Sequence, residues 1–233
     1  MWAFSIVIRR LVSCQLETVV LVLTRLSFKM PVADHPRPSP LALAVLGLLV
    51  GGPLHPYAMQ RLIKEWGKDQ VVNVGHRANL YKTIKRLDEA GLIAVRGTER
   101  DQQYPERTVY QITADGRQLV LDWLATMVST PRNEFPEFPA ALSFVMLLGP
   151  EASEEALRRR AAHLRQELSR HDEELALHSG RLPRVTLLET EYLRAMLAAE
   201  LEWVTATADD LASRALCWTE EDFAEAAAFY ELS

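Results

Sequence analysis

The segment at about residues 76–90 constrains the fold of this chain more than any other feature of the sequence. Leu80, Ile84 and Leu87 follow one another at i, i+4 and i+7, the spacing that places side chains on one face of an α-helix. Residues 75–87 contain four Arg or Lys and no Asp or Glu, and Lys82 and Lys85 fall on the opposite face. The segment therefore predicts a helix with one buried face and one cationic face.

Two shorter helices are predicted before this one. Residues 40–50 are almost wholly apolar, which suits a buried helix, and the Gly-Gly-Pro that follows would end it. A second helix is expected to begin near Pro56, because a proline at the first helical position removes an N–H that has no partner there. Gly67 is the expected end of this helix.

An antiparallel hairpin is predicted after the cationic helix, at about residues 93–113. Residues 93–97 and 108–113 alternate in polarity as strands do, and a loop of about ten residues is expected between them. Thr113 is the expected N-cap of a further helix that continues to about Val128. Helices followed by such a hairpin, with the last helix before it basic, are typical of a winged helix-turn-helix.

The remainder of the chain is predicted to be helical. A long helix from Glu151 carries apolar residues at alternating spacings of four and three, as in a coiled-coil seam. A second long helix at about residues 185–215 should fold back on it, and the broad apolar stripe on both suggests a further helix from another subunit. The expected dimerisation residues are Leu157, Ala161, Leu164, Leu168, Leu175, Tyr192 and Trp203.

The expected fold class is thus mainly α, with a winged helix-turn-helix followed by a helical, coiled-coil-like dimerisation region. The predicted boundaries give an N-terminal extension and Pro-rich leader at 1–39, the winged domain at 40–116 and the helical region at 117–233. The net charge of −5 divides along these boundaries into +3, +2 and −10. Such asymmetry suggests a front that faces nucleic acid and an acidic back that phosphate repels.

Polar and cationic side chains of the winged region form a candidate DNA interface. The major groove admits one helix, and Arg or Asn in its first turn has the donor geometry to read guanine or adenine. Lysines on the exposed face suit phosphate neutralisation, and arginines of the hairpin suit the backbone or the minor groove. The predicted DNA-binding residues are His76, Arg77, Asn79, Tyr81, Lys82, Lys85, Arg86, Arg96, Arg100 and Arg107.

Three runs of the sequence, taken together, resemble the PadR family of bacterial transcriptional regulators over about residues 41–128. They are GGPLHPYAMQRLI, ANLYKTIKRLDEAGLI and TVYQITADGRQLV. Pro56 and Ala78 depart from residues that many members carry, and the second departure bears on contacts in the groove. The resemblance implies a homodimeric repressor of double-stranded operator DNA with a helical C-terminal dimerisation region. Cys14 and Cys217 have neither the spacing of a disulfide framework nor that of a zinc site, which fits a reducing cytoplasm.

The resemblance also implies that a small molecule or a stress signal relieves repression, and that such an effector binds near the dimer interface. An apolar or aromatic effector would suit a pocket lined by Trp123, Phe144, Tyr192 and Trp203. The alternative for these aromatic residues is that they are core. The alternative function for the whole chain is a helical protein-interaction module whose winged domain no longer binds DNA.

Other classes of function have no positive support in the sequence. We find no Gly-rich phosphate loop, nucleophile elbow or paired-carboxylate motif, so we expect no enzyme and no cofactor. His163, His171 and His178 are explained as seam or surface positions, and no metal site is expected. No uncharged run in residues 1–29 approaches the ~20 residues of a membrane-spanning helix. That stretch is either an extension upstream of the working start or an accessory helix, and no function is assigned to it.

Overall fold

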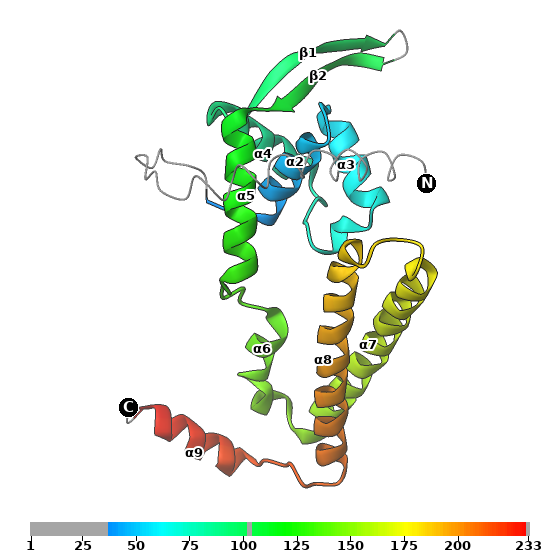
Figure 1. Cartoon of the computed structure of the whole chain (residues 1–233). Coiled ribbons are helices and arrows are strands. Elements are labelled where there is room, and N and C mark those ends of the chain that lie inside the picture. Colours follow the sequence, from blue (N-terminus) through cyan, green and yellow to red (C-terminus); the bar gives the residue numbers. More distant parts are fainter. Residues whose placement is uncertain (1–36, 102–103, 232–233) are drawn as a thin grey trace. The chain divides into compact units, whose positions relative to one another are not determined.

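The computed structural model describes residues 37–101 and 104–231, so the predictions for residues 1–29 lie outside the described part of the chain. The chain divides into two units, with the boundary between Arg132 and Asn133 (Figure 1). The first, the winged unit, contains α2 (Pro40–Val50), α3 (Pro56–Glu65), η1 (Lys68–Gln70), α4 (Arg77–Glu89), β1 (Ile93–Asp101), β2 (Tyr104–Ile112) and α5 (Ala114–Ser129). This order confirms the predicted winged helix-turn-helix.

The core of the winged unit is formed mainly by α2, α4 and α5. Leu80, Ile84 and Leu87 of α4 are at most 2 % exposed, which confirms the buried stripe that the sequence predicted. Ser39 caps α2 by accepting the Ala42 N–H at 3.2 Å, and His55 caps α3 through Nδ1, which accepts the Ala58 N–H at 3.0 Å. The buried core residues are Ala42, Val45, Leu46, Leu49, Met59, Leu80, Ile84, Leu87, Leu92, Ile93, Leu119, Val120 and Trp123.

The helix α5 belongs to the winged unit, whereas the sequence analysis placed the domain boundary after residue 116. Leu119, Val120 and Trp123 of α5 are buried in the same core as α2 and α4. The predicted boundary followed the end of the hairpin, but the apolar face of α5 needs a cover, and α2 supplies it. The structural boundary therefore falls after α5, at residues 132–133.

The hairpin is longer than predicted, and the expected loop of about ten residues is wrong. Its two strands pair from Ile93 opposite Ile112 to Asp101 opposite Tyr104, which leaves two residues between them. Polar and apolar residues do not alternate along this stretch, because residues such as Arg96 and Thr98 are exposed to solvent and do not pack on an apolar core. The register shifts between Val95 and Gly97, which makes Arg96 the extra residue of a bulge.

One contact joins the hairpin to the loop before α3. Leu54 and Tyr110 form an isolated antiparallel bridge, in which each N–H donates to the other residue's carbonyl at 3.0 and 2.9 Å. This bridge was not predicted from the sequence. It ties the base of the wing to the helical part of the unit.

The second, helical unit contains α6 (Glu137–Leu142), η2 (Val145–Leu148), α7 (Pro150–His178), η3 (Arg184–Thr186), α8 (Leu188–Ala212) and α9 (Glu220–Glu231). Its largest contact is the antiparallel pair of α7 and α8, as the sequence predicted. Ion pairs between the two helices join Arg158 to Asp209 at 2.8 Å and Arg160 to Glu200. Thr219 caps α9 by accepting the Asp222 N–H at 3.3 Å.

The predicted seam of α7 is buried within a single chain. Leu157, Ala161 and Leu164 pack in one cluster with Val204 and Ala208 of α8. Of the predicted dimerisation residues, Leu168 and Leu175 are half-buried, while Tyr192 and Trp203 are exposed. Because Leu157, Ala161 and Leu164 are buried against α8, the exposed Tyr192 and Trp203 are the residues open to a second subunit. The dimerisation role stays a prediction.

Within the described residues, no helix combines the length and the apolar character needed to span a membrane.

Candidate nucleic-acid interface

The helix α4 holds its cationic face toward solvent. Its core stripe anchors it, and the side chains of Arg77, Lys82, Lys85 and Arg86 are all exposed. His76 immediately precedes the helix and makes no side-chain cap, and Asn79 is exposed in the first turn. The arrangement that the sequence predicted, with the apolar stripe buried and the cations outside, is present in the folded chain.

The charges of this face are largely uncompensated within the chain. Lys85 Nζ lies 3.6 Å from Glu89 Oε1, and both side chains are more than half exposed. Such an exposed pair contributes little and is readily exchanged for a phosphate contact. Across the described part of the chain, Arg77, Lys82 and Arg86 have no acidic partner within ion-pair distance. The face is therefore free to attract a polyanion.

Tyr81 lies on the side of α4 that faces the wing. Burial raises the pKa of Tyr110 on β2 above its ordinary value, and the nearby Asp88 and Tyr81 of α4 raise it further. Tyr110 is therefore an uncharged phenol at neutral pH, and it lies close to the wing side of α4. Tyr81 is 53 % exposed, so it remains open to a ligand on this side.

The wing carries the remaining predicted residues. Arg96 is exposed on β1. Arg107 on β2 is half-buried, and its guanidinium lies 5.5 Å from the ring centre of Tyr57, which stacks on His55. Arg100 is part of β1, but its side chain lies outside the described residues. The cation–π contact with Tyr57 was not predicted, and it holds one wing arginine near the start of α3.

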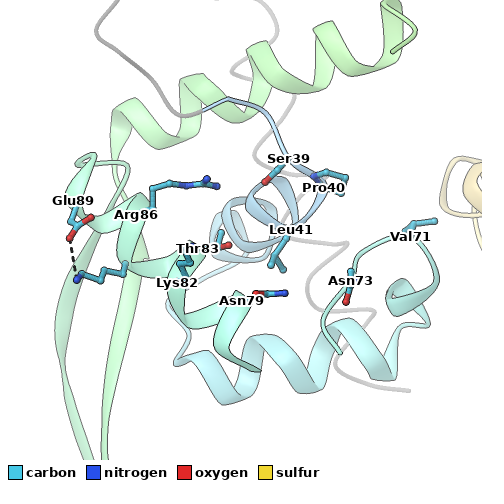
Figure 2. Close-up of a pocket in the computed structure, with 11 residues that line it drawn as sticks. Ser39, Pro40, Leu41, Val71, Asn73, Asn79, Lys82, Thr83, Arg86 and Glu89 are labelled. Carbon is cyan, nitrogen blue, oxygen red and sulfur yellow. Dashed lines mark ion pairs between the residues drawn. The ribbon is translucent and has the colours of Figure 1, made fainter. Parts of the chain in front are cut away.

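A hollow of about 790 Å³ opens beside α4, on the side away from the wing (Figure 2). We call it the α2–α4 hollow. It is lined by Ser39, Pro40, Leu41, Val71, Asn73, Asn79, Lys82, Thr83, Lys85, Arg86 and Glu89. Ser39, Asn73 and Thr83 are not among the residues that the sequence predicted for a site. The sequence did contain a signal for Thr83, because it is a polar residue within the apolar stripe, between Leu80 and Leu87.

The four aromatic residues predicted for an effector pocket belong to different units. Trp123 is 5 % exposed and packs in the core of the winged unit. Phe144, Tyr192 and Trp203 belong to the helical unit and are exposed. Trp203 makes an edge contact with Phe138, with ring centres 6.0 Å apart. The effector pocket stays a prediction.

Comparisons with known proteins agree with this geometry. The sequence profile of the PadR-like family of transcriptional regulators matches residues 45–121. The negative transcriptional regulator PadR of Bacillus subtilis (strain 168) is 31 % identical over 128 residues, which are 53 % of this chain and 69 % of that protein. The chain belongs to the PadR-like family of transcriptional regulators.

Solved structures share the PadR-like fold well beyond the winged unit. The crystal structure of Bacillus subtilis PadR in complex with operator DNA has a TM-score of 0.62 and 22 % identity, and the match covers 74 % of this chain and 99 % of that one. The same protein in complex with p-coumaric acid has a TM-score of 0.60 and 20 % identity, with the same coverage. The predicted fold class, a winged helix-turn-helix with a helical C-terminal region, is confirmed.

Proposed function

We propose that this PadR-like protein is a dimeric, non-enzymatic repressor that acts in the cytoplasm on double-stranded operator DNA. In this proposal α4 enters the major groove and the β1–β2 wing contacts the backbone or the minor groove. The observation that carries it is the exposed cationic face of α4, with Lys82 and Lys85 opposite a stripe that is fully buried. The related PadR of Bacillus subtilis is named a negative regulator and has been crystallised with operator DNA.

The uncompensated charge of α4 argues against the interaction-module alternative. A winged domain released from DNA has no need of a segment such as residues 75–87, which carries four cations and no acidic residue, and exposed like charges repel one another. The chain nevertheless concentrates cations there although its helical region is strongly acidic. This distribution favours a polyanionic partner for the winged unit.

The helical unit supports the proposals of a dimer and of a small effector. It exposes Phe144, Leu147, Tyr192 and Trp203, which are large apolar side chains that a second subunit would cover. We propose a small aromatic effector by analogy with the p-coumaric acid that Bacillus subtilis PadR binds in its crystal structure.

The test is a gel shift with the promoter next to the protein's own gene, repeated at rising salt. The double variant Lys82→Ala, Lys85→Ala should weaken binding to every sequence, because its side chains no longer neutralise phosphates. Each phosphate that is no longer neutralised should reduce the slope of log K against log salt by about 0.9, hence by about 3.6 for the four lysines of a dimer.

The matched control is the double variant Arg165→Ala, Arg181→Ala, which removes the same charge from exposed positions of the helical unit. Its salt slope should equal that of the unaltered protein. In a second arm, Asn79→Ala should cost about 1–3 kcal/mol on the operator and little on random DNA, as for a base-reading side chain. A Lys82, Lys85 variant that binds as tightly, with the same slope, would overturn the proposal.

A further inference from the structure

One residue that lines the α2–α4 hollow, Thr83, is polar although it belongs to the buried face of α4. Thr83 is 9 % exposed and lines this hollow. Figure 2 shows it on the side of α4 that faces the first turn of α2, between Lys82 and Leu41. The residue is buried as a whole, but its hydroxyl oxygen is not among the fully buried side-chain atoms that lack a partner, so a ligand in the hollow can reach it.

The Thr83 hydroxyl has no hydrogen-bond partner within the described part of the chain. Two exposed helical threonines of this chain bond their own helix: the hydroxyls of Thr126 and Thr207 each donate to the carbonyl four residues earlier, at 2.9 Å. Thr83 does not make that bond to Asn79. Its hydroxyl is therefore left as an open donor at the bottom of the hollow.

The walls of the hollow add further donors and positive charge. The first turn of α2 forms one wall, and its Leu41 N–H lies at a helix N-terminus, where partial positive charge favours anions. Figure 2 shows the Arg86 side chain reaching from α4 toward Ser39 across the opening. The one acidic residue of the lining, Glu89, is paired with Lys85. The lining thus combines an open hydroxyl, an open N–H and two cations without acidic partners, Lys82 and Arg86.

We propose that the α2–α4 hollow binds one phosphodiester of the DNA backbone in each half-site, held by the Thr83 hydroxyl and the Arg86 guanidinium at the N-terminus of α2. The inference rests on the proposed function, because it assumes that α4 enters the major groove. It divides the roles along α4: the flank that carries Thr83 and Arg86 follows a sugar–phosphate strand and sets the register of the helix, without reading sequence. Asn79, at one end of the hollow, remains the candidate base reader.

The experiment uses the full-length protein and operator duplexes that carry a single uncharged methylphosphonate, moved one position at a time. For the unaltered protein, a methylphosphonate at one phosphate per half-site should weaken binding more than at any other position. The loss there should be about tenfold, as expected for a charge-assisted hydrogen bond. The variant Thr83→Val keeps the shape and removes the hydroxyl. It should bind the unmodified operator more weakly by a similar factor and become insensitive to the methylphosphonate at that one position.

The matched control is Thr126→Val, which makes the same change on an exposed, internally bonded threonine of α5 and should leave the scan unaltered. The ratio of operator to random-DNA affinity should stay constant in Thr83→Val. Arg86→Gln changes an exposed residue outside the core, and it should also make binding insensitive to the methylphosphonate at that position. This second variant keeps the test valid if Thr83→Val disturbs folding.

Three results would overturn the inference. In the first, the unaltered protein binds the operator, but Thr83→Val and Arg86→Gln show the same sensitivity to each methylphosphonate position as the unaltered protein. The hollow then holds no backbone phosphate, while the proposed function stands. If inorganic phosphate competes with DNA better than chloride at equal ionic strength, and Thr83→Val removes this difference, the hollow is a site for the free ion. If the unaltered protein binds no DNA at all, the inference and the proposed function fail together.

Discussion

A single methyl group at Gly116 should destabilise the winged unit severely. Gly116 lies in the first turn of α5, where a Cβ would stand 2.1 Å from the carbonyl oxygen of Leu92 and 2.9 Å from Cγ1 of Ile112. The Leu92 carbonyl would have to retreat by about 1.3 Å or more to reach ordinary contact distance. Leu92 is fully buried and directly precedes β1, so the displacement would fall on the junction between α4 and the wing.

The magnitude follows from what that carbonyl holds. It accepts the Thr113 N–H at 3.1 Å and the Thr113 hydroxyl at 3.0 Å, while Thr113 caps α5 by accepting the Gly116 N–H at 3.1 Å. Overpacking of a core costs about 1–3 kcal/mol. Two weakened hydrogen bonds add about 1 kcal/mol each, so Gly116→Ala should cost about 4 kcal/mol. This is a large fraction of the stability of a typical domain.

Urea unfolding followed by far-UV circular dichroism measures the destabilisation. The matched control is Gly97→Ala in β1, because a Cβ there meets nothing within 4 Å and the backbone φ is not in the left-handed region. The control should lower the free energy of unfolding by less than about 1 kcal/mol. If Gly116→Ala costs no more than Gly97→Ala, the contact between α5 and the Leu92 carbonyl is not what fixes this junction.

Two further predictions concern the helical unit. His171 is 4 % exposed in the α7 seam, its Nδ1 has no hydrogen-bond partner, and Glu174 Oε2 is 3.9 Å away; His171→Leu should therefore raise the free energy of unfolding by about 1 kcal/mol, and a lower melting temperature would contradict this. Hydrogen bonds from Arg184, at 2.9–3.2 Å, hold the pKa of the Glu191 carboxyl below its ordinary value. A lowered pKa in the folded state means that the pair stabilises the fold above the ordinary glutamate pKa and loses this effect as the pH falls. Arg184→Gln should return the Glu191 titration midpoint, measured by NMR, to the ordinary value, and an unchanged midpoint would refute the assignment.

The sequence by itself determined the elements and the character of their faces. The spacing of Leu80, Ile84 and Leu87 predicted both the helix α4 and its buried side, and Thr113 predicted the start of α5, because helical periodicity and capping are encoded within a few consecutive residues. The same local information gave the exposed cationic face from Lys82 and Lys85. For these features the structure adds bounds and leaves the predicted roles as they were.

The tertiary structure decided what covers each face. The sequence predicted that α8 folds back on α7, yet it assigned Leu157 and Leu164 to a dimer interface, whereas the structure buries both against α8 of the same chain. The length of the wing was also hidden, since strands with solvent on both sides need no alternation around Arg96. The α2–α4 hollow is the clearest case. Thr83 and Ser39 are 44 residues apart and ordinary in sequence, and they line one site because burying the apolar faces of α2 and α4 against each other places them there.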